Sequence, residues 1–339
     1  MKHIFGIQSH LTFYVAHKII QLNQFNPDDC LFISGRNYKI PDKYNSIYKH
    51  IYSLHYGGGK IGRFFSGINI VKTQKNISQF DRIIDDFTGS DCYDCYISYC
   101  GDDVANLVVT KKNCVAYYLT EEGIGVYSDK NPKIFSGWRY LIYRVVLKPL
   151  FPRLYAIKEN YQYTKYYKFK GFYAISSQAY PLFQSYPITI IGNPFETIDI
   201  GFSPDVLLSI DPFFWNLSIN TVDKIYYHLS KYIKGKNYHT ITYKYHPMFG
   251  VYPDIKKEYE KIIHQYFGNN IIQLDDTVVL ENIMMTYKCD FYSNGSSVQI
   301  YGTIAGAKCY DFSSFIRSDI DDVSDIPFED CVKEVQFLP

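Results

Sequence analysis

The chain has 339 residues, of which 47% are hydrophobic and 20% are charged, and its formal net charge at pH 7 is +1. This length predicts two domains, because one domain usually has roughly 150 residues. The apolar share allows a substantial core, and the near-neutral charge argues against a protein that binds nucleic acid or another polyanion over its whole surface.

Membrane-spanning and secreted proteins are also disfavoured. No stretch reaches the roughly 18 apolar residues of a membrane-spanning helix. The N-terminus, MKHIFGIQSHLTF, is typical of a first strand rather than of a signal peptide. Most of the eight cysteines lie in apolar, strand-like runs, so we expect buried free thiols. These features predict a cytoplasmic protein.

In the first half of the chain, short apolar runs alternate with amphipathic stretches. We expect strands at 3–9, 30–34, 94–100, 114–120, 172–177 and 188–194, and helices at 11–22 and 77–87. Such β-α alternation is typical of a parallel, doubly wound sheet. The first predicted domain covers residues 1–195.

The same alternation restarts after a predicted linker near 195–204. We expect strands at 205–212, 239–247 and 270–276, a strand that enters a loop over 289–297, a last strand at 307–312, and helices at 220–233, 255–266 and 297–306. The second domain then covers 205–325, and 326–339 is a C-terminal tail. Two Rossmann-like domains in tandem predict the α/β plan called GT-B, in which two such domains face a cleft.

An acidic motif ends the strand predicted at 114–120. Glu121 and Glu122 are followed by Gly123, which permits a tight turn and close approach of another group. A carboxylate in this place could act as a general base if its surroundings raised its pKa. A solvated acidic turn is the alternative interpretation.

A His-Pro pair ends the strand predicted at 239–247. Pro247 cannot donate to a sheet and favours an extended backbone at His246. The imidazole is therefore presented at the carboxyl end of a strand, where ligands bind in α/β folds. A turn that merely stops the strand is the alternative.

A serine-rich loop, SNGSS at 293–297, joins a predicted strand to a predicted helix. Ser296 and Ser297 would cap that helix, and the free backbone N–H groups of the loop, which includes Asn294, form a ready phosphate site. An ordinary helix cap is the alternative.

Two other strand ends carry weaker candidates. Gln8 and Ser9 follow the first strand and would line the acceptor side of a site. Asp211 and Pro212 follow the first strand of the second domain and would meet a nucleotide.

Taken together, the three motifs resemble those of bacterial sialyltransferases of GT-B type, which include lipooligosaccharide sialyltransferases, capsule polysialyltransferases and multifunctional sialyltransferases. These enzymes share a (D/E)(D/E)G motif, an HP motif and a paired Ser/Thr motif in this order. The resemblance spans the chain but depends on these short motifs alone. Here the acids are Glu121 and Glu122 rather than a pair containing Asp, which leaves open which of them is the base.

The resemblance implies an inverting transferase whose donor is a CMP-activated nonulosonic acid, most often CMP-sialic acid. His246 would assist the departing phosphate, Pro247 would fix the direction of its ring, and Ser296 and Ser297 would hold the phosphate. Glu121 or Glu122 would take the proton from an acceptor hydroxyl on a bacterial surface glycan of lipopolysaccharide or capsule. A monophosphate leaving group has less need of a metal, so no metal and no further cofactor are expected.

A basic, aromatic segment covers residues 131–171, with nine Lys or Arg and one acid, Glu159. One interpretation is a patch that rests on the anionic inner membrane, where lipid-linked acceptors are found. The other is an amphipathic helix at about 134–148 that packs on the first domain.

Other functions stay open on sequence alone. The same fold would serve a transferase that uses a UDP-sugar, CMP-Kdo or CMP-pseudaminate, and it would also serve a non-catalytic protein that binds a glycan or a nucleotide.

Overall fold

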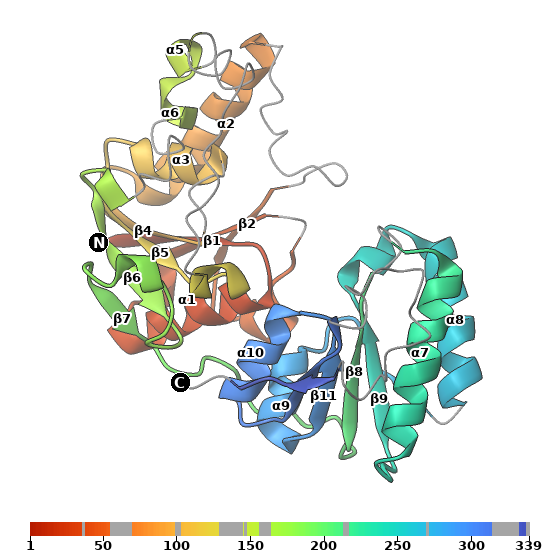
Figure 1. Cartoon of the computed structure of the whole chain (residues 1–339). Helices are drawn as coiled ribbons and strands as arrows, with labels where there is room; N and C mark the ends of the chain where they lie inside the picture. The colour runs from red at the N-terminus through yellow and green to blue at the C-terminus, as the bar shows by residue number, and fades with distance from the viewer. Residues whose placement is uncertain are drawn as a thin grey trace. The chain divides into compact units, whose positions relative to one another are not determined.

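The structure is a computed structural model that describes residues 1–35, 38–54, 70–98, 103–128, 145, 148–155, 164–212, 217–268, 271–313 and 332–336. The chain divides into two compact units, Met1–Pro194 and Phe195–Pro339. Each unit has its own sheet and its own flanking helices (Figure 1). The stretch expected as a linker bonds to the second unit, since the backbone N–H of Ile198 donates to Thr286 Oγ1 at 2.8 Å.

The described strands of the first unit form a parallel seven-stranded sheet in the order β3-β2-β1-β4-β5-β6-β7. The strands are β1 (Lys2–Ile7), β2 (Cys30–Ser34), β3 (His50–Ser53), β4 (Tyr93–Ile97), β5 (Cys114–Thr120), β6 (Phe169–Ala174) and β7 (Ile188–Ile190). The helices are α1 (His10–Asn23), α2 (Ile70–Thr88), α3 (Asp103–Thr110), α5 (Lys148–Leu150) and α6 (Pro152–Tyr155).

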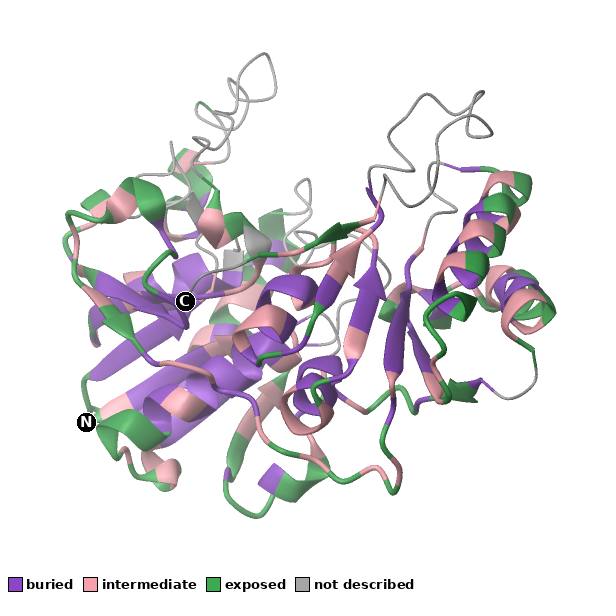
Figure 2. Ribbon diagram, turned by 60° about the horizontal axis from the view of Figure 1, so that its bottom comes forward, coloured by how far each residue is buried: buried purple, intermediate pink, exposed green. Residues whose placement is uncertain are grey.

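Apolar side chains of this first sheet are buried on both faces. On one face, Phe5 and Phe32 stack at 5.5 Å, and Phe13 of α1 lies 5.7 Å from Phe32. On the other face, aliphatic residues of β1, β2 and β4 share a core with α2 and α3. Buried residues accordingly fill the strands and the inner sides of the helices (Figure 2). Coverage on both faces explains why the strands read as continuous apolar runs.

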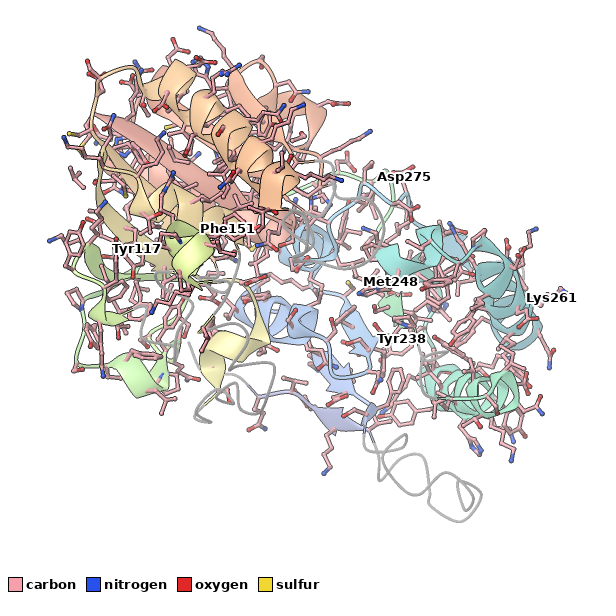
Figure 3. The ribbon with its side chains drawn as sticks, turned by 90° about the horizontal axis from the view of Figure 1, so that it is seen from above. Tyr117, Phe151, Tyr238, Met248, Lys261 and Asp275 are labelled. Atoms are coloured by element: carbon pink, nitrogen blue, oxygen red, sulfur yellow. The ribbon has the colours of Figure 1, made fainter. Side chains whose placement is uncertain are left out.

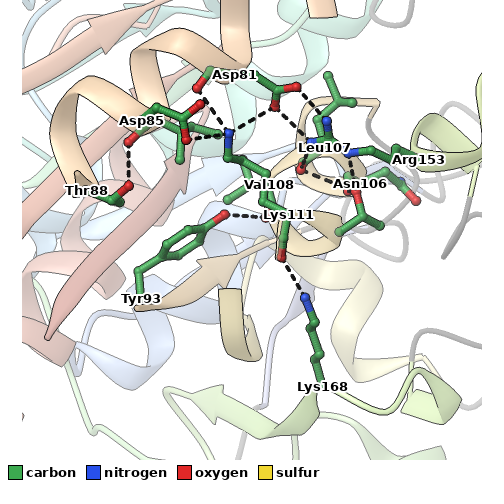
Figure 4. A network of polar contacts seen from close by, with 12 residues as sticks. Asp81, Asp85, Thr88, Tyr93, Asn106, Leu107, Val108, Lys111, Arg153 and Lys168 are labelled. Carbon is green, nitrogen blue, oxygen red and sulfur yellow. Dashed lines mark hydrogen bonds and ion pairs between the residues drawn. The ribbon is translucent and has the colours of Figure 1, made fainter. Parts of the chain in front are cut away.

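A polar network ties three helices of the first unit together (Figure 4). Arg153 of α6 donates to both carboxylate oxygens of Asp81 in α2, at 2.5 and 2.9 Å, and to the carbonyl of Leu107 in α3 at 2.8 Å. Lys168 is buried and donates to the carbonyl of Lys111 at 2.7 Å. Two basic residues of the segment 131–171, Arg153 and Lys168, therefore bond to other parts of this unit.

The described strands of the second unit form a six-stranded sheet in the order β10-β9-β8-β11-β12-β13. The strands are β8 (Val206–Ile210), β9 (Ile241–Tyr245), β10 (Ile272–Gln273), β11 (Asp290–Ser293), β12 (Cys309–Asp311) and β13 (Lys333–Glu334). The helices are α7 (Ile219–Lys234), α8 (Pro253–Phe267), α9 (Leu280–Tyr287) and α10 (Ser297–Ile304). Helices α7 and α8 share a core with one face of the sheet, and α9 belongs to the core on the other.

Strand order reverses once in each sheet, between β1 and β4 in the first unit and between β8 and β11 in the second. Ligands of open α/β sheets bind beyond the carboxyl ends of the strands at such a reversal. The fold therefore marks one candidate position in each unit.

The C-terminal part of the chain differs from expectation. Strand 307–312 is not the last one, because β13 pairs antiparallel with β12, and Tyr310 lies opposite Glu334. Part of the expected tail 326–339 thus belongs to the second sheet. An edge strand of two residues has no periodicity that a sequence pattern could reveal.

The membrane predictions are only partly addressed. Within the part of the chain that the structure describes, none of the helices has both the length and the apolarity to cross a bilayer. The helix expected at about 134–148 lies almost entirely outside the described residues.

Candidate functional site

The acidic motif lies at the carboxyl end of β5, and its two acids have different environments. Glu121 is fully buried, and its Oε2 accepts a hydrogen bond from the backbone N–H of Ile175 at 2.7 Å. Its Oε1 accepts from the hydroxyl of Tyr127. Both carboxylate oxygens therefore hold neighbouring segments in place, which is a structural role.

Glu122 is half-buried, and the chain turns at Gly123 directly after it. Gly123 has φ of 156°, a value that favours glycine, and it starts the 3₁₀ turn η3 (Ile124–Tyr127). Successive side chains of an extended chain point to opposite sides. Since Glu121 points into the protein, the side chains of Glu121 and Glu122 face opposite sides of the chain.

His246 directly follows β9 and is exposed, with an extended backbone at φ −60° and ψ 141°. Its Nδ1 accepts a hydrogen bond from the backbone N–H of Met248 at 3.2 Å; Met248 is labelled in Figure 3. Desolvation by the surrounding protein, followed by the charge of Lys244, lowers the pKa of His246. Because Nδ1 accepts, the form of the ring that makes this contact carries its proton on Nε2.

The two serines at the start of α10, Ser296 and Ser297, differ in their hydrogen bonds. Ser296 is the N-cap residue, and its hydroxyl oxygen accepts from the backbone N–H of Val298 at 3.3 Å. Three groups here have no hydrogen-bond partner among the described residues. They are the backbone N–H groups of Ser296 and Ser297 and the hydroxyl of Ser297. A helix N-terminus with free donors attracts an anion.

Two carboxylates shape the loop before these serines. Asp211 at the end of β8 is buried, and its Oδ2 accepts from the backbone N–H of Asn294 at 3.0 Å. Asp311 at the end of β12 accepts from the N–H of Gly295 at 2.9 Å. Burial and then the neighbouring Asp311 raise the pKa of Asp211 to about 6, although its hydrogen bonds from Asn294 and Ser209 oppose the shift. The N–H groups of Asn294 and Gly295 are thus already used, so an anion at this loop would meet the serine donors.

The residues predicted for the second domain converge on one strand end. The backbone N–H of His246 donates to the carbonyl of Ile210 at 3.0 Å, one residue before Asp211. His246 and Asn294 therefore flank the end of β8 from its two neighbouring strands. Pro212 follows Asp211 and is half-buried.

The remaining first-unit candidates are Gln8 and Ser9, beyond the end of β1. Ser9 caps α1, with its Oγ accepting from the backbone N–H of Thr12 at 3.3 Å. Gln8 lines a small cavity at the same edge of the sheet. The structure thus gives Ser9 a capping role and leaves Gln8 beside a possible ligand position.

Sequence reasoning missed two buried charged residues of the second unit, Lys244 and Glu281. Lys244 in β9 donates to the carbonyl of Val278 at 2.5 Å, and desolvation lowers its pKa. Burial raises the pKa of Glu281, in the first turn of α9, to about 7, although its own backbone N–H and Lys244 oppose the shift. Buried groups with such shifts are frequent in functional sites. A lysine within the apolar run ITYKY was the one sequence feature that could have drawn attention to the pair.

A metal centre is not evident in the described residues, since nowhere among them do three His, Cys, Asp or Glu side chains group in a way that could hold an ion. Six described cysteines are free, and of these Cys92 is exposed and Cys95 is buried.

Comparison with solved structures identifies the class of fold. The chain is similar to the GT-B domain of a sialyltransferase from Photobacterium damselae, with a TM-score of 0.51, 11% identity, and coverage of 88% of this chain and 87% of that one. It is also similar to a UDP-GlcNAc 2-epimerase from Methanocaldococcus jannaschii, with a TM-score of 0.51, 13% identity, and coverage of 93% and 84%. A UDP-GlcNAc 2-epimerase from Neisseria meningitidis, bound to UDP-GlcNAc, gives a TM-score of 0.50, 14% identity, and coverage of 92% and 82%.

These similarities confirm the GT-B fold predicted from the sequence, with two Rossmann-like domains. At such low identity they show the fold alone, and the fold serves both transferases and epimerases. No protein-family model matches the chain, and no curated protein matches it either.

Proposed function

We propose that this protein is an inverting glycosyltransferase that moves sialic acid, or a related nonulosonic acid, from a CMP-sugar to a hydroxyl of a bacterial surface glycan. The observation that supports the proposal is the set of donors beyond β9 and β11. The serine N–H groups, the Ser297 hydroxyl and the Nε2–H of His246 are all without a partner among the described residues. Such a set matches one phosphate monoester, as in CMP.

In the proposed reaction the acceptor oxygen attacks the anomeric carbon of the nonulosonic acid. The bond between that carbon and the phosphate oxygen breaks, and its electron pair leaves with CMP. The Nε2–H of His246, with the ring direction fixed by Pro247, donates a hydrogen bond to the departing phosphate, where charge develops. Glu122 accepts the proton of the acceptor hydroxyl. Attack from the face opposite the phosphate inverts the anomeric configuration.

A monophosphate leaving group carries less charge than a diphosphate, and in this proposal hydrogen-bond donors of the protein bind it. We therefore propose that the enzyme needs neither a metal nor another cofactor.

The proposal is tested by the nucleotide that stabilises the protein. A ligand that binds only the folded state raises the melting temperature. We expect CMP to raise it more than UDP or GDP at equal concentration. A larger shift with UDP would instead favour a UDP-sugar donor, and no shift with any nucleotide would contradict a nucleotide-dependent transferase.

We also propose that the enzyme acts in the cytoplasm and touches the inner membrane through the segment 131–171. Lys165 and Lys170 are exposed, which leaves their charges for anionic lipid headgroups. Sedimentation with anionic vesicles should fall in Lys165→Glu/Lys170→Glu but not in Lys257→Glu, a change at an exposed lysine of the second unit. Equal sedimentation of all three proteins would refute the membrane contact.

A further inference from the structure

The first unit contains a small cavity at the carboxyl edge of its sheet, where the strand order reverses between β1 and β4. Its volume is ≈ 30 Å³. One water molecule needs roughly 10–15 Å³ of such space, so the cavity holds two or three groups of that size. A sugar ring or a lipid chain is too large for it.

The wall of the cavity is mainly aliphatic and comes from β1, β2, β4 and α3, with Leu54 just beyond β3. The main contributors are Ile4, Ile33, Leu54, Ile97, Val104 and Val108. Sugar hydroxyl groups would lose hydrogen bonds with water in such surroundings and find few replacements. The wall therefore favours an apolar group.

Two polar side chains, Gln8 and Ser98, interrupt this wall. Ser98 follows β4 and lines the cavity, and its Oγ is buried without a hydrogen-bond partner in the part of the chain that the structure describes. A buried hydroxyl is costly when it is unpaired. A ligand that brings one polar atom next to its apolar group would remove this cost.

Gly6 keeps the cavity open from the middle of the central strand β1. Its neighbours Phe5 and Ile7 are fully buried, whereas Gly6 is only half-buried. A Cβ added at Gly6 would lie 3.4 Å from Ile97 Cγ2, an ordinary contact. Packing alone therefore does not require glycine here. A glycine inside a strand often marks the close approach of a ligand.

The position of the cavity relates it to the acidic motif. Strand β4 neighbours β5, and Ile97 lies opposite Leu119. Ser98 thus stands beside Thr120, and Glu122 follows two residues later in the same unit.

We infer that this cavity receives the acetamido group of the acceptor, so that the acceptor is an N-acetylated amino sugar. The methyl group enters the aliphatic wall, and the carbonyl oxygen accepts a hydrogen bond from the Ser98 hydroxyl. This inference rests on the proposed function, because it takes the first unit as the acceptor side.

The test measures binding without any donor. N-acetylglucosamine, N-acetylgalactosamine, glucose and galactose are titrated into the full chain and followed by NMR. At least one acetamido sugar should bind roughly fivefold or more tightly than its parent sugar, the scale set by burying one methyl group and gaining one hydrogen bond. Equal binding of both kinds of sugar, or no binding of any acetamido sugar, overturns the inference.

Variants locate the effect. Gly6→Ala should abolish the preference for the acetamido sugar and leave the melting temperature unchanged or slightly higher, because alanine is favoured over glycine within a strand. Ser98→Ala should weaken the preference severalfold. Gly235→Ala is the matched control, because its Cβ would also lie 3.4 Å from its nearest neighbour, the carbonyl oxygen of Tyr232, in the second unit. A preference that survives in both Gly6→Ala and Ser98→Ala would contradict the assignment.

A CMP titration on the same preparations separates this inference from the proposed function. Preference for acetamido sugars without CMP binding would leave the cavity assignment in place and remove the transferase proposal. CMP binding without a preference for acetamido sugars would remove the cavity assignment and leave the transferase proposal in place.

Discussion

His246 shows how one backbone contact selects a chemical role. The N–H of Met248 occupies Nδ1, so the neutral ring presents Nε2–H to a ligand. A protonated imidazolium would have to give up this contact, because it has no acceptor nitrogen. We therefore interpret His246 as a hydrogen-bond donor to the leaving phosphate rather than as an acid that transfers a proton.

We expect His246→Ala to lower turnover roughly a hundredfold, the scale of losing a positioned donor in a transition state. His246→Gln, which can place an N–H near the same point, should recover part of that loss. Turnover against pH should show no fall assigned to His246 as the pH rises above about 6.5, because the neutral form is the active one. A fall there that disappears in His246→Gln would show that the protonated ring is required.

The two adjacent glutamates are separated by their contacts. In Glu121→Gln the new NH₂ group would face the N–H of Ile175 or the hydroxyl of Tyr127, so a donor would meet a donor and a hydrogen bond would be lost. The free energy of unfolding should therefore fall by roughly 1–3 kcal/mol. Glu122→Gln should keep its stability and its affinity for CMP but lose turnover. Thermal melts, CMP titration and turnover are measured on both variants. An active, folded Glu122→Gln protein would rule out Glu122 as the base.

The sequence alone predicted both acids as candidates but could not choose between them. The choice depends on the N–H of Ile175, a residue 54 positions further along the chain that only the parallel pairing of β5 and β6 brings near. The same limit hid Glu281, whose burial arises from tertiary packing and not from a local pattern.

At the scale of one element, the first turn of α10 combines a cap with a proposed anion site. The Ser296 hydroxyl oxygen accepts from Val298, whereas the Ser297 hydroxyl has no partner among the described residues. The two roles are therefore carried by different side chains and can be removed separately.

We expect Ser296→Ala to reduce the free energy of unfolding by roughly 0.5–2 kcal/mol, as for the loss of an N-cap. Ser297→Ala should melt as the unchanged protein does but bind CMP roughly tenfold more weakly, because a hydrogen bond to an anion is lost. Each protein is examined by a thermal melt and by calorimetric titration with CMP. Normal CMP affinity in Ser297→Ala would leave the helix start as a cap alone.

Sequence patterns predicted some elements closely and missed others. The expected strands 30–34 and 114–120 match β2 and β5 from end to end, because continuous apolar runs mark strands that are buried on both faces. Helices α3 and α9, of eight residues each, were not predicted, whereas α10, also of eight residues, was expected at 297–306.

At the scale of the whole molecule, the alternation of strands and helices was enough to predict two Rossmann-like domains, and the structure neighbours confirm the GT-B fold. The order of strands, and with it the two reversal points, required the structure. The residues expected in the second domain, Asp211, His246 and Asn294, gather at one of these points. The fold does not decide, however, which sugar donor these residues would bind.

The central claim is that a CMP-activated nonulosonic acid is the donor. The most direct measurement is the release of free nucleotide from a panel of CMP- and UDP-sugars, in EDTA, with a mixture of glycan acceptors. The account predicts release of CMP from CMP-sialic acid or a related CMP-sugar, undiminished by EDTA and lost in Glu122→Gln. Release of UDP from a UDP-sugar with no release of CMP, or activity that returns only on addition of Mg²⁺ or Mn²⁺, would contradict it.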